Sequence, residues 1–225
     1  MPLLGKAAIA MWWDVAPAQR AEFEDWHAHE HFPERLRIPG FLRGSRWAST
    51  EGNGSFFVMY ELEAYETFTS PGYRKRLDNP TPWSVKMMPH HRNMMRSQCR
   101  IIESCGGGLG RFTMTVRLSP EQSRRDALSG HLRNVLRALP AVRGLTGAHL
   151  LETDTPKSDP TTEQKIRGGD AVADWIVLVS GYDPQSIVSL ASADFADSTL
   201  TAAGARPNRA FSLYQLVYAL TPHDL

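Results

Sequence analysis

The same order of predicted strands and helices occurs twice along this chain, and the repeat restricts the possible folds more than any other feature of the sequence. A predicted strand begins at Gly5, and a similar one begins at Gly110. A helical pattern follows each strand and ends near Gly40 in the first half and near Gly144 in the second. Two adjacent strands, a second helical region and a closing strand complete each half, so the order β-α-β-β-α-β is present twice.

One such unit is the ferredoxin-like arrangement, in which two helices cover one face of a four-stranded antiparallel sheet. The other face of the sheet remains bare, and the sheet of a second unit is its natural cover. We therefore predict an α+β protein in which two tandem ferredoxin-like units pack their sheets together into an α/β barrel within one chain. A glycine-rich link at 106–110 places the repeats at residues 1–105 and 106–225.

Charge restricts the binding partners that we expect for this chain, and cysteine content restricts its compartment. The 225 residues include 25 basic and 24 acidic side chains, the net charge is +1, and no long run of one sign occurs. Neither nucleic acid nor a membrane surface is therefore favoured, and the first apolar run ends at Asp14, too early to span a bilayer. Cys99 and Cys105 fit neither a disulfide framework nor a zinc spacing. These features predict a soluble, cytoplasmic protein with reduced thiols.

The first predicted helix carries the most distinctive chemistry of the chain. Its spacing places five side chains on one face, namely Phe23, Trp26, His27, Glu30 and His31. A face that begins with two aromatic side chains is normally buried, and burying imidazoles and a carboxylate is costly unless each finds a partner. We predict that His27 and His31 carry out acid–base chemistry and that Glu30 orients one imidazole. The alternative is that these histidines bond backbone groups at the rim of the core.

A metal site is a further alternative for the histidine pair. Two histidines one helical turn apart are a common ligand pair, and Glu30, His90 or His91 could complete the set. The His-Glu-x-x-His order with a remote third ligand is missing, however, and His29 lies on another face of the helix. We therefore expect no metal. Glycine-rich phosphate loops and the Gly-x-Ser-x-Gly motif are also missing, which disfavours nucleotide cofactors and a serine hydrolase.

Aromatic side chains and one arginine are the predicted substrate-binding groups. Trp12 and Trp13 alternate along the first strand, so one faces the helices and the other faces the opposing sheet. Arg46 either binds an anionic oxygen or faces solvent. Such aromatic residues are also common in an ordinary core, and the methionines near residue 90 suit either a ligand entrance or a subunit contact. The predicted substrate-binding residues are Trp12, Trp26, Arg46, Trp47, Tyr60, Trp83 and His90.

Two short motifs suggest a family. The first helix contains His31-Phe32-Pro33, and Ile38-Pro39-Gly40 stands just before the second strand. This pattern resembles the EthD-like branch of the dimeric α/β-barrel superfamily, in a duplicated form. Members of that branch commonly carry His-x-Pro on the first helix and Leu/Ile-Pro-Gly before the second strand. The resemblance implies that His31 is the histidine of the motif, with His27 one turn earlier.

The second half departs from this pattern. His131 matches His27 in position, but Val135 stands where His31 would be. Residues 153–170 are rich in Pro, Asp, Thr and Gly, which predicts a long mobile loop. The resemblance therefore implies that the amino-terminal repeat holds the site, whereas the carboxy-terminal repeat is mainly a structural partner.

These observations predict an enzyme without an organic cofactor, an isomerase, dehydratase or lyase that acts on a small apolar or aromatic carbonyl or hydroxy compound. One alternative is a haem- or metal-dependent enzyme or a monooxygenase of the same superfamily. Another is a protein that binds a small ligand without turnover. Edge strands that remain unpaired invite further association, so we also expect a homodimer.

Overall fold

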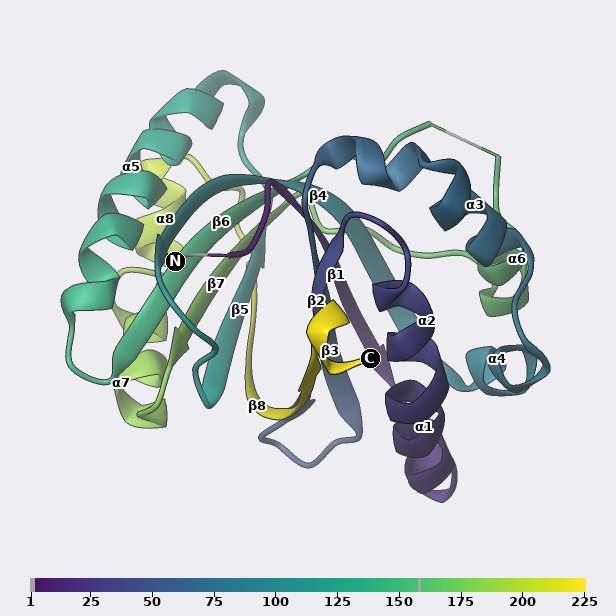
Figure 1. Ribbon diagram of the computed structural model, residues 1–225. Coiled ribbons are helices and arrows are strands. Elements are labelled where there is room, and N and C mark those ends of the chain that lie inside the picture. Colours follow the sequence, from purple (N-terminus) through teal and green to yellow (C-terminus); the bar gives the residue numbers. More distant parts are fainter. Residues whose placement is uncertain (1–2, 158) are drawn as a thin grey trace. The chain divides into compact units, whose positions relative to one another are not determined.

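The computed structural model describes residues 3–157 and 159–225, and the chain is an α+β protein (Figure 1). The strands are β1 (Ala7–Asp14), β2 (Phe41–Ser49), β3 (Ser55–Leu62), β4 (Arg92–Gly106), β5 (Phe112–Leu118), β6 (Leu145–Thr153), β7 (Trp175–Gly181) and β8 (Ala210–Leu220). The α-helices are α1 (Arg20–Trp26), α2 (Phe32–Leu36), α3 (Pro71–Asp78), α4 (Pro82–Met87), α5 (Arg125–Ala138), α6 (Thr162–Arg167), α7 (Pro184–Ser189) and α8 (Asp197–Ala203).

The strands follow the hydrogen-bonded order β1-β3-β2-β8-β5-β7-β6-β4, which closes on itself as a barrel. This order confirms the predicted α/β barrel built from two ferredoxin-like units. Closure also gives every strand two neighbours, so the unpaired edges that led us to expect a homodimer are not present among the described strands. The homodimer stays a prediction without that support. None of the helices in the described part of the chain is long and apolar enough to cross a membrane.

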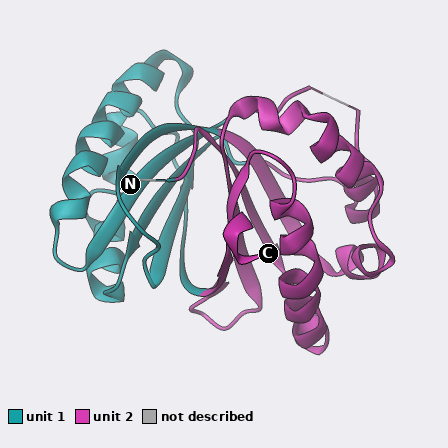
Figure 2. Cartoon of the chain, in the orientation of Figure 1, with its two compact units in different colours: residues 1–3, 100–153, 173–216 teal, residues 4–99, 154–172, 217–225 magenta. Residues whose placement is uncertain are grey.

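The chain forms two compact units, coloured separately in Figure 2. One unit, which we call the histidine unit, contains residues 4–99, 154–172 and 217–225. The other contains Leu3 and residues 100–153 and 173–216. The units therefore do not follow the predicted repeat boundary strictly, because two segments of the second repeat pack with the first. The strands β4 and β8 each contribute to both units.

In the histidine unit, β3 pairs antiparallel with β1 on one side and with β2 on the other. Trp12 lies opposite Phe57, and Phe57 lies opposite Trp47. These rings stack along one face of the sheet at centroid distances of 5.0 and 5.2 Å. Since side chains alternate along a strand, Trp13 points to the other face, where it packs in the core with Phe23 of α1. The helices α1 to α4 and α6 lie on this side of the strands (Figure 1).

Close packing of α2 against β2 depends on a glycine. A Cβ atom added at Gly44 would lie 2.5 Å from the Phe32 ring and 2.9 Å from the Tyr60 ring. Any side chain at this position would therefore push α2 away from the sheet.

In the other unit, α5 buries Leu128, Leu132 and Leu136, which are spaced so that they form one face of the helix.

We predict opposite effects for two glycine-to-alanine changes. Gly44→Ala should lower the free energy of unfolding by roughly 1–3 kcal/mol, because the new methyl group overpacks the contact with Phe32. Gly130→Ala should raise it by roughly 0.4–1 kcal/mol, because Gly130 lies within α5 and a Cβ atom added there would meet no other atom within 4 Å. Urea unfolding of both variants measures the difference. A Gly44→Ala variant as stable as the wild type would contradict the packing described here.

Candidate functional site

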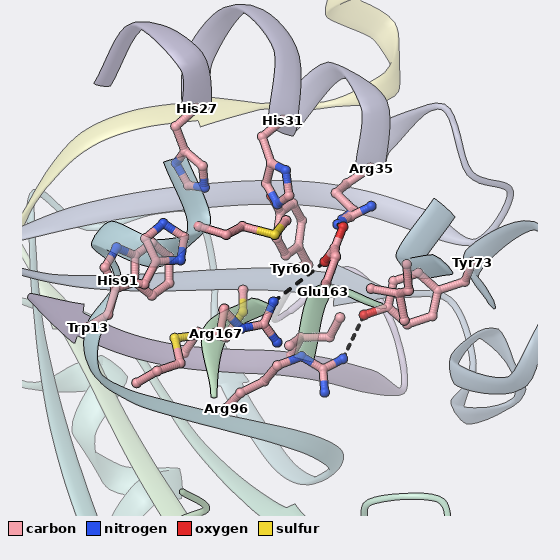
Figure 3. A pocket seen from close by; sticks show the side chains of 15 residues that line it. Trp13, His27, His31, Arg35, Tyr60, Tyr73, His91, Arg96, Glu163 and Arg167 are labelled. Atoms are coloured by element: carbon pink, nitrogen blue, oxygen red, sulfur yellow. Dashed lines mark hydrogen bonds and ion pairs between the residues drawn. The ribbon is translucent and has the colours of Figure 1, made fainter. Parts of the chain in front are cut away.

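The histidines of the first helical segment line a cavity in the histidine unit, which we call the inner cavity (Figure 3). About 30 Å³ of it is open to the centre of a water-sized sphere, which is room for a water molecule or two. Its walls come from β1, β3, β4, α2, α3, α6 and the turns beside them. It is lined by Ile9, Met11, Trp13, His27, His31, Arg35, Tyr60, Tyr73, Leu77, Met88, His91, Met94, Arg96, Glu163 and Arg167.

Six of these side chains bury a nitrogen or oxygen atom that has no hydrogen-bond partner among the described residues. They are Trp13, His27, His31, Arg35, Tyr60 and His91. Buried polar groups are normally paired, and leaving one unpaired costs about 1–3 kcal/mol. Six such groups around one small cavity distinguish its wall from an ordinary core, in which buried polar groups are paired.

The helical segment that carries the histidines is not a uniform α-helix. The backbone N–H of Phe32 donates to the carbonyl of His27, five residues earlier, so a π-helical turn over His27–His31 joins α1 to α2. Such wide turns within α-helices occur frequently at functional sites. The His27 and His31 rings still lie on the same side, with stacked planes and centroids 5.4 Å apart. Both therefore face the inner cavity, as the sequence predicted.

Glu30 does not have the contacts that we expected. Its carboxylate accepts hydrogen bonds from Trp26 Nε1 at 3.1 Å and from the Thr81 hydroxyl at 2.6 Å. The expected bond to one of the two imidazoles is not found among the described contacts. The π turn explains the difference, because one extra residue per turn shifts the helix face away from the 3.6-residue spacing on which the prediction was based. Glu30 thus links the first helix to α4.

Burial keeps the three imidazoles of the cavity uncharged. It lowers the pKa of His27 and of His31 well below the usual range, and for His31 the nearby Arg35 guanidinium adds to the effect. Burial, with a contribution from Arg167, lowers the pKa of His91 to about 3. Each ring is therefore neutral at pH 7 and has one nitrogen free of a proton. Such a ring can accept a proton from a bound acid.

A network of buried charges joins α2 to α6. Arg35 forms an ion pair with Glu163, and Glu163 also lies 3.6 Å from Arg167. Arg167 pairs in turn with Asp170 at 3.0 Å. All four side chains are at most 6% exposed. Because a buried charge is costly without a partner, this network fixes α6 against the cavity (Figure 3).

The segment that carries Glu163 and Arg167 corrects two expectations. Residues 153–170 do not form a continuous mobile loop, because α6 begins within them with a capping box between Thr161 and Gln164. This segment also belongs to the second repeat, so that repeat supplies part of the cavity wall and is not merely a structural partner. The sequence contains no local signal for this contact.

Of the predicted substrate-binding residues, Tyr60 lines the inner cavity, and burial raises the pKa of its phenol, so the hydroxyl stays protonated. Trp26 lies beside the cavity, with its ring centroid 4.5 Å from that of His31, but is not part of the wall. Arg46 is buried, and its guanidinium lies over the rings of Phe23 and Tyr218. It therefore neither reaches the cavity nor faces solvent.

The other predicted substrate-binding residues lie outside the cavity. Trp12 and Trp47 are on the opposite face of the sheet, and Trp83 donates a hydrogen bond to Glu22 at 3.2 Å. The neighbour of His90, His91, lines the cavity instead and stacks on Trp13 at 4.7 Å. The described residues contain no group of three His, Cys, Asp or Glu side chains placed to hold a metal ion.

Comparisons with known proteins bear on the fold. No protein-family model and no curated protein matches this chain. A solved structure of a putative monooxygenase from Fusobacterium nucleatum aligns with 97% of this chain and 96% of its own, with a TM-score of 0.64 and 7% identity. An anthrone oxidase-like protein aligns over 98% and 95%, with a TM-score of 0.64 and 11% identity. This chain shares their fold. At such low identity, the likeness shows the fold alone.

We predict that acid weakens the folded state. A histidine has a pKa of about 6.5 in the unfolded chain, and the three cavity histidines have lower values when folded. Their contribution to the free energy of unfolding is fully present above pH ~6.5. It is lost as the pH falls toward the pKa of the folded state, because the unfolded chain then binds more protons than the folded chain. Each histidine changes the free energy of unfolding by up to ~1.4 kcal/mol per pH unit.

Urea unfolding between about pH 7 and pH 5 measures this slope. His91→Phe, which keeps an aromatic ring against Trp13, should reduce it. Met94→Leu changes the same cavity without removing a titrating group and should leave the slope unchanged. Equal slopes for wild type and His91→Phe would show that His91 is not held neutral in the fold.

Proposed function

We propose that this chain is an enzyme without an organic cofactor that uses the histidines of the inner cavity for acid–base chemistry. The substrate would be a small apolar or aromatic carbonyl or hydroxy compound, and the reaction an isomerisation, dehydration or related elimination. The observation that supports this proposal best is the set of six polar side chains with a buried atom that has no partner among the described residues, in a wall that also contains aromatic, methionine and aliphatic side chains. This combination suits a ligand with an apolar body and one or two oxygen atoms.

In the proposed mechanism, His31, His27 and Arg35 have separate roles. The neutral imidazole of His31, with His27 beside it, accepts the acidic proton of the substrate and leaves an enolate or phenolate anion. Arg35, which has one buried guanidinium nitrogen without a partner in the described part of the chain, stabilises that anion. The adjacent anion in turn stabilises the imidazolium, which burial alone disfavours. Return of the proton to another atom completes an isomerisation, and loss of a leaving group completes an elimination.

The His31-Phe32-Pro33 motif and its resemblance to the EthD-like branch support the same histidine. A duplicated ancestry is consistent with the tandem ferredoxin-like order of the strands. The cavity itself is small, so a substrate enters by displacing flexible side chains. Met11, Met88 and Met94 lie in the wall and provide that adaptability.

Oxygenation is a second candidate, favoured by the shared fold with the proteins named as a putative monooxygenase and as anthrone oxidase-like. It would begin with the same removal of a proton by a histidine. A haem does not fit the inner cavity, since pockets for drug-sized ligands alone measure about 300–1,000 Å³ and the open space here is about 30 Å³. The proposed mechanism therefore contains no step that takes place on haem.

The test is a panel of small aromatic and apolar carbonyl and hydroxy compounds, incubated with purified protein and analysed for products by mass spectrometry. For any compound that is converted, His31→Ala should lower kcat/KM by roughly two to four orders of magnitude. His29→Ala changes an exposed histidine of the same π turn and should leave turnover unchanged.

Circular dichroism confirms that both variants fold, and oxygen uptake separates oxygenation from isomerisation and elimination. Turnover that survives in His31→Ala would remove this histidine from the mechanism. Conversion that depends on a Soret-absorbing or metal-containing fraction would overturn the cofactor-free proposal. Binding without any product would instead identify a ligand-binding protein.

A further inference from the structure

A second cavity adjoins the inner cavity within the histidine unit, and we call it the outer cavity. About 330 Å³ of it is open to the centre of a water-sized sphere, so it has much more room than the inner cavity. Leu77 and Arg96 line both cavities and therefore form the boundary between them. The outer cavity is lined by Phe68, Thr69, Arg74, Leu77, Arg96, Gln98, Thr155, Pro156, Thr161 and Gln164.

Positive charge predominates in the walls of these two cavities. Four arginines line them, namely Arg35, Arg74, Arg96 and Arg167. Three of the four have carboxylate partners among the described residues: Glu163 for Arg35, Asp78 for Arg74 and Asp170 for Arg167.

Arg96 is the exception among these arginines. It is 8% exposed, and its guanidinium donates to the Tyr73 hydroxyl at 2.7 Å and to the Gln98 side-chain oxygen at 3.3 Å. Both acceptors are neutral, and no described carboxylate lies within ion-pair distance of Arg96. Burial disfavours the charge of Arg96, but Tyr73, Asp170 and Glu163 outweigh that effect and raise the pKa of the guanidinium, so Arg96 is charged. A buried guanidinium with no carboxylate paired directly to it still has a place for an anion to bind beside it.

We propose that the ligand of this site carries a carboxylate that Arg96 binds, with the rest of the ligand extending toward the histidines of the inner cavity. This inference rests on the proposed function for the identity of the reacting end and adds the class of substrate, a small organic acid. The planar guanidinium matches a carboxylate with two parallel hydrogen bonds. Phe68, Leu77 and Pro156 supply apolar surface for the body of the ligand.

The experiment compares benzoate with benzamide, a neutral compound of nearly the same shape, by isothermal titration calorimetry on the full chain. Benzoate should bind roughly ten- to a hundredfold more tightly, the factor expected for a hydrogen bond with charged partners. Arg96→Gln should remove this preference and leave the weaker benzamide binding unchanged. Arg76→Gln is the matched control, because Arg76 lies on α3 in the same unit, pairs with Glu34 and lines neither cavity.

If the wild-type protein binds benzoate and benzamide with equal affinity, or does not bind benzoate, the proposal is overturned. This comparison needs no variant, so it holds whether or not Arg96→Gln folds. Inorganic phosphate that binds as tightly as benzoate would overturn the assignment of a carboxylate. A loss of preference in Arg76→Gln equal to that in Arg96→Gln would also overturn it. Binding is measured without turnover, so loss of turnover in His31→Ala with benzoate binding intact bears on the proposed function separately.

Discussion

The cost of burying charge is the constraint on which the histidine unit depends. The Arg35 side chain projects from α2 into the core, where it forms an ion pair with Glu163 from a distant part of the sequence. Arg167 and Asp170 extend the network, so α6 is held against the cavity by ion pairs that water barely reaches. If any one of these charges lost its partner, the remaining charge would be stranded in the core, at a cost of several kcal/mol. The shape of the site therefore follows from charge pairing as much as from apolar packing.

The same constraint determines the chemistry of the histidines. A site that already holds several guanidinium groups disfavours further positive charge, and burial acts in the same direction. The imidazoles are therefore proton acceptors in the free protein, and an anion formed beside them is stabilised by the cations. Arg96 places a further positive charge at the outer cavity, where its hydrogen-bond partners are neutral. Proton transfer and anion binding are thus two consequences of one charge distribution.

The sequence predicts the fold well, because the β-α-β-β-α-β order depends on local patterns that occur twice. It also predicts that His27 and His31 face inward. It misplaces Glu30, since a π turn cannot be read from 3.6-residue spacing, and it leaves the face of Trp12 undecided, since alternation along a strand has two equivalent phases. Glu163 and its partner Arg35 of α2 are 128 residues apart in the sequence, and no local pattern predicts their contact.

The most direct test of a shielded acid–base site is an NMR titration of the imidazole rings of His27, His31 and His91 in the free protein, with assignments from single substitutions. We expect all three rings to remain neutral at pH values well below the one at which histidines of the unfolded chain gain a proton, since burial and neighbouring guanidinium groups disfavour their protonation. Rings that gain protons near pH ~6.5, as histidines do in the unfolded chain, would show that water reaches them freely. That result would contradict the burial of these rings and the proton transfer assigned to them.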